Sequence, residues 1–268
     1  MATIARRVAA AMEKIAPLRL AEKWDNVGLL VESPVSRSDA RQVLLTIDLT
    51  TAVCNEALST HTSTIIAYHP PLFRPLSSLT MSNPLQASLL RCVAAGVSIY
   101  SPHTAVDSVK NGVNDWLASA FNNVESVETI SQADGEEEGT GIGRLVRLNK
   151  PLQLQDIYPL VKRHLNLQHL QVAKGSTSDI KTIAICAGSG GSVLKGVQAD
   201  LYWTGELSHH EVLAAVAEGR SVVLCGHSNT ERGYLVHLKE RLESELAGGG
   251  DTLEIKISQE DKDPLVVV

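Results

Sequence analysis

Short apolar runs alternate with helix-period patterns along the first half of the chain. The apolar runs predict strands after the turn in 24–33 and over 42–50, 62–69 and 97–103. Helical spacing predicts helices over 2–15, 50–59, 83–96 and 111–121. Because Pro70 and Pro71 lack a backbone N–H, the strand that contains Tyr68 and His69 must end there. Strands that alternate with helices indicate a largely parallel sheet covered on both faces.

The second half repeats this alternation after an acidic, glycine-containing segment at 131–141, which we interpret as an exposed linker or loop. Strands are predicted over 142–149, 170–175, 199–207, 221–227 and 252–257, and helices over 152–165, 207–218 and 229–246. The segment 180–194 predicts a strand, a glycine-rich turn and a helix start. The expected fold is α/β, with two linked αβ domains over 1–130 and 142–268 whose sheets are largely parallel or mixed.

Composition narrows the class of partner. The chain has 268 residues, a formal charge of −6 and 4% aromatic residues, which argues against general nucleic-acid binding. It has no run of eighteen apolar residues, so we expect no membrane span. The four cysteines lie far apart in apolar stretches, which favours buried free thiols and a cytoplasmic protein. We expect 2–15 to be a structural helix rather than a cleaved targeting segment.

Three of the apolar strands carry a histidine at or just beyond their carboxyl end: His69, His103 and His227. Ligands of open α/β sheets bind outside the carboxyl ends of the strands. A single such histidine is as well explained by a capped loop, but three at equivalent positions point to a shared site.

Two of these histidines have a carboxylate four residues later, Asp107 after His103 and Glu231 after His227. On a helical turn this spacing places imidazole and carboxylate on one face. Either pair alone could be a solvated ion pair. Together with His69 they predict a site for one or two divalent ions, Zn²⁺, Mn²⁺ or Fe²⁺.

Glu206 and His210, with the same spacing of four residues, follow the strand segment "ADLYW" (199–203). They are candidates for positioning a ligand or for general acid–base catalysis. An equally good explanation is that a helix starts here and its dipole stabilises a carboxylate at the N-terminus. The sequence "CAGSGGS" (186–192) lacks a complete phosphate-binding motif, so we expect a tight strand-to-helix turn rather than a nucleotide site.

Several segments, taken in order, resemble the Nif-three-like family, also called GTP cyclohydrolase I type 2. They are "AEKWDNVGLLV" (21–31), "LLTIDLT" (44–50), "YHPPLFRPL" (68–76), "IYSPHTAVDSVKNGVNDWLA" (99–118), "GSGGS" (188–192), "DLYWTGELSHHEVL" (200–213) and "GHSNTERGYL" (226–235). The resemblance implies two linked α/β domains, a dinuclear metal centre in the cleft between them, and ring-like hexamers.

Carried over by position, the resemblance implies metal ligands at His69, Asp107, His227 and Glu231, with His103 near the metals. The bacterial pattern begins with two consecutive histidines, whereas this chain has Tyr68 at the first position, as in the eukaryotic branch. A phenol ligates a metal only after losing its proton, which it holds with a reference pKa near 10, so Tyr68 is expected to form a hydrogen bond near the centre.

Two hypotheses for function follow. The first is a metal-dependent hydrolase of a small phosphorylated or nucleotide-like substrate, with His103, Glu206 and His210 as catalytic candidates. The second is a metal-binding scaffold or regulator that recruits protein partners, such as transcription-related factors. The cyclohydrolase label requires a purine pocket, and no residues of this sequence identify one.

Overall fold

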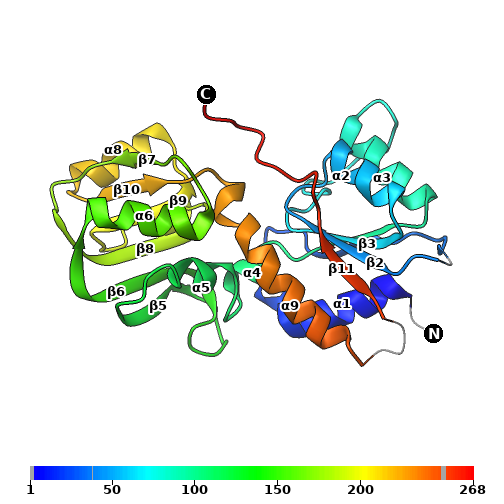
Figure 1. Cartoon of the computed structure of the whole chain (residues 1–268), viewed down its shortest axis with the longest axis horizontal. Helices are drawn as coiled ribbons and strands as arrows, with labels where there is room; N and C mark the ends of the chain where they lie inside the picture. Colours follow the sequence, from blue (N-terminus) through cyan, green and yellow to red (C-terminus); the bar gives the residue numbers. More distant parts are fainter. Residues whose placement is uncertain (1–2, 38, 249–251) are drawn as a thin grey trace. The chain divides into compact units, whose positions relative to one another are not determined.

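The computed structural model describes residues 3–37, 39–248 and 252–268. The chain forms two compact units, each made of segments that are distant in sequence. Unit 1 comprises Met1–Val106 and Leu235–Lys262, and unit 2 comprises Asp107–Tyr234 and Asp263–Val268. Each unit contains a sheet (Figure 1), so the α/β class with two αβ units is confirmed. The first predicted helix begins at residue 2, which lies outside the described residues.

The sheet of unit 1 is mixed but mainly parallel. Its strand order is β1-β4-β3-β2-β11, and β1 is antiparallel to β4 while the other pairs are parallel. The strands are β1 (Gly28–Val31), β2 (Gln42–Thr46), β3 (Thr62–Ala67), β4 (Ser98–Ser101) and β11 (Glu254–Ile257). The parallel strands β2, β3 and β4 therefore end at the same edge.

Helices cover both faces of this sheet, as its continuous apolar strands require. Helices α2 (Thr51–Ser59) and α3 (Pro84–Ala94) pack on the face that includes Leu44 and Ile65. Helices α1 (Ile4–Ile15) and α9 (Leu235–Leu246) lie side by side and contact β2, β3 or β4 (Figure 1). Adjacent residues of one strand, such as Ile65 and Ile66, are both buried because the strand has no solvent-exposed face.

The sheet of unit 2 is mixed. Its order is β5-β6-β8-β9-β10-β7, with parallel pairs β8–β9 and β9–β10 and antiparallel pairs elsewhere. The strands are β5 (Val124–Gln132), β6 (Gly141–Gln153), β7 (Gln171–Ala173), β8 (Asp179–Ser189), β9 (Leu201–Glu206) and β10 (Ser221–Leu224). The three parallel strands again end at one edge.

Helices of unit 2 contact strands of this sheet, and the later ones connect its strands. They are α5 (Val113–Ala118), α6 (Leu154–Leu165), α7 (Gly191–Leu194) and α8 (His209–Ala217). The short helix α4 (Thr104–Ser108), whose first residues belong to unit 1, precedes them. Ser208 caps α8 in a capping box with Glu211, which explains why this helix begins at His209. No helix in the described part of the chain is long and apolar enough to cross a membrane.

Three features differ from the sequence-based expectations. The acidic segment 131–141 connects β5 to β6 within unit 2, so it is a hairpin loop rather than a boundary between units. Helix α9 and strand β11, expected in the C-terminal domain, belong to unit 1. The predicted helix over 229–246 begins with two 3₁₀ turns, at 228–230 and 232–234, and becomes α-helical at Leu235.

A buried arginine organises the hairpin of unit 2. Arg144 in β6 is 2% exposed, and its Nη2 donates to Asp115 Oδ2 at 3.0 Å while its Nε donates to the other carboxylate oxygen. Its remaining N–H groups donate to the carbonyls of Gly139, Gly141 and Gly143. A buried guanidinium is tolerated only when its donors are satisfied and its charge is balanced.

Asp115→Ala is expected to lower the free energy of unfolding by about 3 kcal/mol, because it leaves the Arg144 charge buried without a counter-ion. Denaturant titration measures this loss. Asp134→Ala, at an exposed carboxylate in the same hairpin, is the matched control and should cost less than about 0.5 kcal/mol. Equal effects of the two substitutions would show that the ion pair does not stabilise the unit.

Candidate metal centre

In unit 1, the backbone ladder between β2 and β3 continues past the ends of both strands. Tyr68 N donates to Thr46 O at 2.9 Å, and His69 N donates to Ile47 O at 3.0 Å. This register places His69 beside Asp48, and His69 Nδ1 lies 3.0 Å from Asp48 Oδ1. The two prolines that follow His69 end the strand, so the imidazole is held at the edge of the sheet.

His103 occupies the corresponding place on the next strand. Its N–H donates to Tyr68 O at 3.1 Å, and its Nδ1 lies 2.8 Å from Asp25 Oδ1. The rings of His69 and His103 have their centroids 5.5 Å apart. His103 has a φ of +33°, a backbone conformation that is unfavourable for a residue with a side chain. The hydrogen bond to Asp25 helps to hold this conformation.

Asp25 is the most enclosed carboxylate around these histidines, because its side chain has no exposed area. Burial raises the pKa of this carboxyl group, but the hydrogen bonds from His103 and Thr104 lower it by a larger amount. The pKa of Asp25 therefore lies below its usual value. Asp25 is therefore ionised near neutral pH and accepts hydrogen bonds only. This requires the proton of a neutral His103 to be on Nδ1.

In unit 2, the ends of β9 and β10 repeat the same construction. Cys225 N donates to Thr204 O at 3.2 Å and Gly226 N donates to Gly205 O at 2.9 Å, so the ladder again continues past the strands. His227 then lies beside Glu206, with His227 Nδ1 2.9 Å from Glu206 Oε1. Each of the three histidines thus presents its Nδ1 to a carboxylate on another segment.

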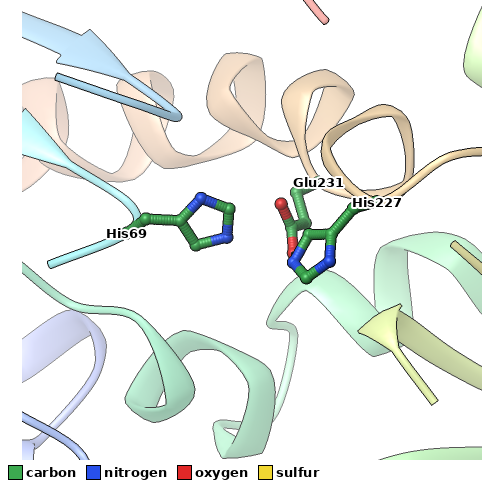
Figure 2. Close-up of side chains that lie close together, drawn as sticks. All are labelled: His69, His227 and Glu231. Atoms are coloured by element: carbon green, nitrogen blue, oxygen red, sulfur yellow. The ribbon is translucent and has the colours of Figure 1, made fainter. Parts of the chain in front are cut away.

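Glu231 faces the other nitrogen of His227. The 3₁₀ turn 228–230 brings its carboxylate back toward the strand end, and His227 Nε2 lies 3.3 Å from Glu231 Oε1. Figure 2 shows the two side chains next to each other. The Glu231 side chain is 4% exposed. When Nδ1 carries the proton, Nε2 and Oε1 are both electron-pair donors, and two donors at this distance repel each other unless a cation lies between them.

The glycine-rich turn after β8 makes room for this pair. Gly188 has a φ of +60°, and a Cβ there would lie 2.7 Å from Glu231 Oε1 and 2.8 Å from His227 Nε2. Its N–H donates to Thr230 Oγ1 at 2.8 Å, which ties the turn to the 3₁₀ segment. The segment is therefore a tight strand-to-helix turn, as expected, and it lies against the two donor groups.

Asp107 lies in α4 and is the remaining predicted ligand. Burial raises the pKa of the Cys186 thiol, and the negative charges of Asp107 and Glu231 raise it further. Both carboxylates are therefore close enough to Cys186 to act on its charge, which places them in one region of unit 2.

Each unit offers donor atoms of the kind that bind divalent metal ions. Histidines that bind metals commonly donate their other ring N–H to a carboxylate, which fixes the tautomer and leaves Nε2 as the ligand atom. His69 and His227 both have this arrangement, and Glu231 adds a carboxylate oxygen. Figure 2 shows these three side chains, His69 from the segment after β3 and the other two from the segment after β10. Their chemistry suits Zn²⁺, Mn²⁺ or Fe²⁺.

The structure separates the two residues that the sequence paired as Glu206 and His210. Glu206 ends strand β9 and contacts His227, whereas His210 is an exposed residue of α8. His210 lines a cavity of about 310 Å³ that also includes Gly191, Lys195, Tyr202 and Glu211. The shared helix face assumed for the pair does not exist, because the helix begins three residues after Glu206.

Sequence reasoning missed Asp25 and Asp48, which hold the two histidines of unit 1. Asp48 lies just after an apolar strand, so the rule that selected the histidines could also have selected it. Asp25 is separated from His103 by 78 residues and lies in no strand, so local spacing gives no signal for it.

Comparisons with known proteins agree with this architecture. A family model described as "Duf34/NIF3 (NGG1p interacting factor 3)" matches residues 3–264. The "Protein NIF3 homolog" of Schizosaccharomyces pombe is 46% identical, covering 100% of this chain and 99% of that protein. The "NGG1-interacting factor 3" of Saccharomyces cerevisiae is 41% identical, covering 95% and 93%.

Solved structures show the same fold. A Bacillus cereus protein related to NIF3 superposes with a TM-score of 0.86 at 20% identity, covering 98% of this chain and 99% of that chain. Reduced HcgD from Methanocaldococcus jannaschii superposes with a TM-score of 0.79 at 27% identity, covering 94% and 96%. The protein is thus an α/β protein with candidate metal ligands at its strand ends. It belongs to the Duf34/NIF3 family.

Gly188→Ala is expected to cost more than about 3 kcal/mol of unfolding free energy, because the added methyl group overlaps Glu231 and His227 and the positive φ is strained. Gly196→Ala is the matched control, because Gly196 has a φ of +80° but nothing within 4 Å of an added Cβ. It should cost about 1 kcal/mol. Denaturant unfolding measures both values, and similar losses would contradict the close approach at Gly188.

Asp25→Asn is expected to lower the free energy of unfolding at pH 7, and this loss should become smaller as the solution becomes acidic. Because the pKa of Asp25 is lower in the folded than in the unfolded state, its stabilising effect is present above the ordinary carboxyl pKa. That effect is lost as the pH falls through the lowered pKa. Urea unfolding of both proteins between pH 7 and pH 3 gives the difference, and a difference that grows on acidification would contradict this linkage.

Proposed function

We propose that this chain is a divalent-metal-dependent hydrolase of a small phosphorylated or nucleotide-like substrate. His69, His227 and Glu231 are the proposed ligands of one tightly held ion, Zn²⁺, Mn²⁺ or Fe²⁺. The observation that carries the proposal is the pairing of each strand-end histidine with a carboxylate through Nδ1. Histidines that bind metals commonly have such a carboxylate partner on the ring nitrogen that does not bind the metal, and here three strand-end histidines share the arrangement.

Asp107 is the proposed ligand of a second, weaker ion. Its charge acts on Cys186 together with that of Glu231, which supports a place near the first ion. Tyr68 stands where the bacterial form of the family has a histidine, and this side chain is 1% exposed. A buried neutral phenol is a poor metal ligand, so we expect the second ion to bind less tightly than the first.

A bound divalent ion would supply a water molecule of lowered pKa and a positive charge for an anionic substrate. The side chains of the protein would then transfer protons and hold the geometry. His103 is the proposed proton-transfer group, because Asp25 fixes its tautomer and leaves Nε2 able to accept a proton. Asp48 and Glu206 orient His69 and His227. His210 lies on α8, and its proposed part is limited to contact with substrate.

A metal-dependent scaffold that recruits proteins is the second candidate. It is favoured by the name of a relative, "NGG1-interacting factor 3", which describes an interaction rather than a reaction. In this case the ion would stabilise the fold, and its removal would lower the melting temperature. A hexameric ring and a cytoplasmic location are further predictions, which size-exclusion chromatography with light scattering and cell fractionation can test.

Glu206→Ala is expected to weaken metal binding about 10- to 100-fold, because His227 loses the group that orients its ring. Metal analysis and competition with a chelator measure the affinity, and the wild type should retain about one tight ion per chain. Asp39→Ala is the matched control, because Asp39 holds Nδ1 of His61 at the surface with a separation of 3.0 Å. A loss of affinity in the control, or none in Glu206→Ala, would contradict the assignment.

His103→Ala is expected to lower kcat by about 100-fold or more while the metal content stays unchanged. The assay uses the metal-loaded full-length protein with a panel of nucleotides and phosphoesters. His227→Ala should lose both metal and turnover. If the metal-loaded wild type turns over none of these substrates while metal removal still lowers Tm, the scaffold is supported and the hydrolase is rejected for this substrate class.

A further inference from the structure

Two of the four cysteines form a close pair inside unit 1, and neither is one of the proposed ligands. Cys54 lies in α2 and Cys92 lies in α3, and the Sγ atoms are 3.8 Å apart. Both residues are fully buried where the two helices pack against the sheet. The other two cysteines, Cys186 and Cys225, lie in unit 2 and are also free thiols.

We infer that Cys54 and Cys92 are a redox-active pair, which a small peroxide oxidises to a reversible disulfide that joins α2 to α3. A disulfide has a sulfur–sulfur distance of about 2 Å, so the sulfurs must approach each other by less than 2 Å. Rotation of the two side chains, together with a small shift between the neighbouring helices α2 and α3, would have to supply this approach.

The surroundings of the pair favour Cys54 as the sulfur that reacts first. The hydrogen bond from Cys92 lowers the pKa of Cys54. Burial raises this pKa, but the nearby positive charge of Arg91 also lowers it. The pKa of Cys92 is raised by the same hydrogen bond. A thiolate is the reactive form of cysteine, so the two sulfurs have different roles.

The reaction with hydrogen peroxide balances in two steps. The Cys54 thiolate attacks one peroxide oxygen, an S–O bond forms, the O–O bond breaks, and hydroxide leaves with the electron pair. The Cys92 sulfur then attacks Cys54 Sγ, the S–S bond forms and the S–O bond breaks. The departing hydroxide and the proton of Cys92 give water. Two sulfurs are oxidised and peroxide is reduced.

The new bond would close a loop over residues 54–92, and this loop contains β3 and His69. A cross-link restricts the unfolded chain, so the oxidised protein should melt at a higher temperature than the reduced one. Because the sulfurs lie among apolar side chains, including Leu89 and Val53, a bulky thiol reagent should react slowly with the native protein. The chemistry does not require a metal ion, so it holds or fails independently of the proposed hydrolase.

The test uses the full-length protein, reduced, freed of reductant and treated with hydrogen peroxide. Remaining thiols are blocked with N-ethylmaleimide under denaturing conditions, and the digest is analysed by mass spectrometry. We expect a cross-linked peptide pair containing Cys54 and Cys92, loss of two of the four thiols, a raised Tm, and full reversal by dithiothreitol.

Cys92→Ser keeps a hydroxyl beside Cys54 but removes the second sulfur, so it should abolish the cross-link and leave Cys54 as a sulfenic acid, which dimedone traps when added with the denaturant. Cys225→Ala is the matched control, a buried free thiol in unit 2, and should form the cross-link as the wild type does. Four surviving thiols, a cross-link that involves Cys186 or Cys225, or oxidation to sulfinic acid without a disulfide would overturn the inference. The peptide map of the wild type decides the question even if a variant fails to fold.

Discussion

The candidate centre depends on one construction, a histidine whose Nδ1 is held by a carboxylate at the end of a neighbouring segment. His69 with Asp48 and His227 with Glu206 are both products of a parallel ladder that continues past its last strand residues. Parallel strands bring their carboxyl ends to one edge, so the backbone register decides which side chains become neighbours. The ionised carboxylate then decides which ring nitrogen keeps the proton. A metal site needs both a fixed ring position and the correct tautomer, because an imidazole that rotates or carries its proton on the ligating nitrogen is a weak ligand.

Each unit builds this arrangement from its own residues and adapts the surrounding backbone to it. In unit 2, the left-handed Gly188 lets the turn after β8 approach His227 and Glu231, and Thr230 links that turn to the ligand segment. In unit 1, His103 takes an unfavourable positive φ that the buried Asp25 helps to hold. Strain and close packing of this kind gather where function constrains the geometry, and both features lie beside the proposed ligands rather than in the cores.

Most strands and helices follow from local sequence, and the exceptions have a physical reason. Strand β5 alternates exposed and half-buried residues without an apolar run, so its strand character comes from pairing with β6. Helix α9 and strand β11 belong to unit 1 because β11 pairs with β2, more than two hundred residues earlier in the chain. Chain order suggests a boundary near 131–141, but the antiparallel pairing of β5 with β6 on either side makes this segment a hairpin loop.

The sequence by itself determined which residues could form a centre: three apolar strands that end in histidines, with carboxylates four residues after two of them. It also determined the family, because the order of the motifs is preserved along nearly the whole chain. Only the tertiary structure decided how these side chains are held. Asp25 contacts His103, which is 78 residues later in the sequence. Glu206 contacts His227 on the neighbouring strand, whereas the sequence had paired Glu206 with His210 on a shared helix. Local spacing determines which residues can share a helical turn, whereas strand register determines which distant residues meet.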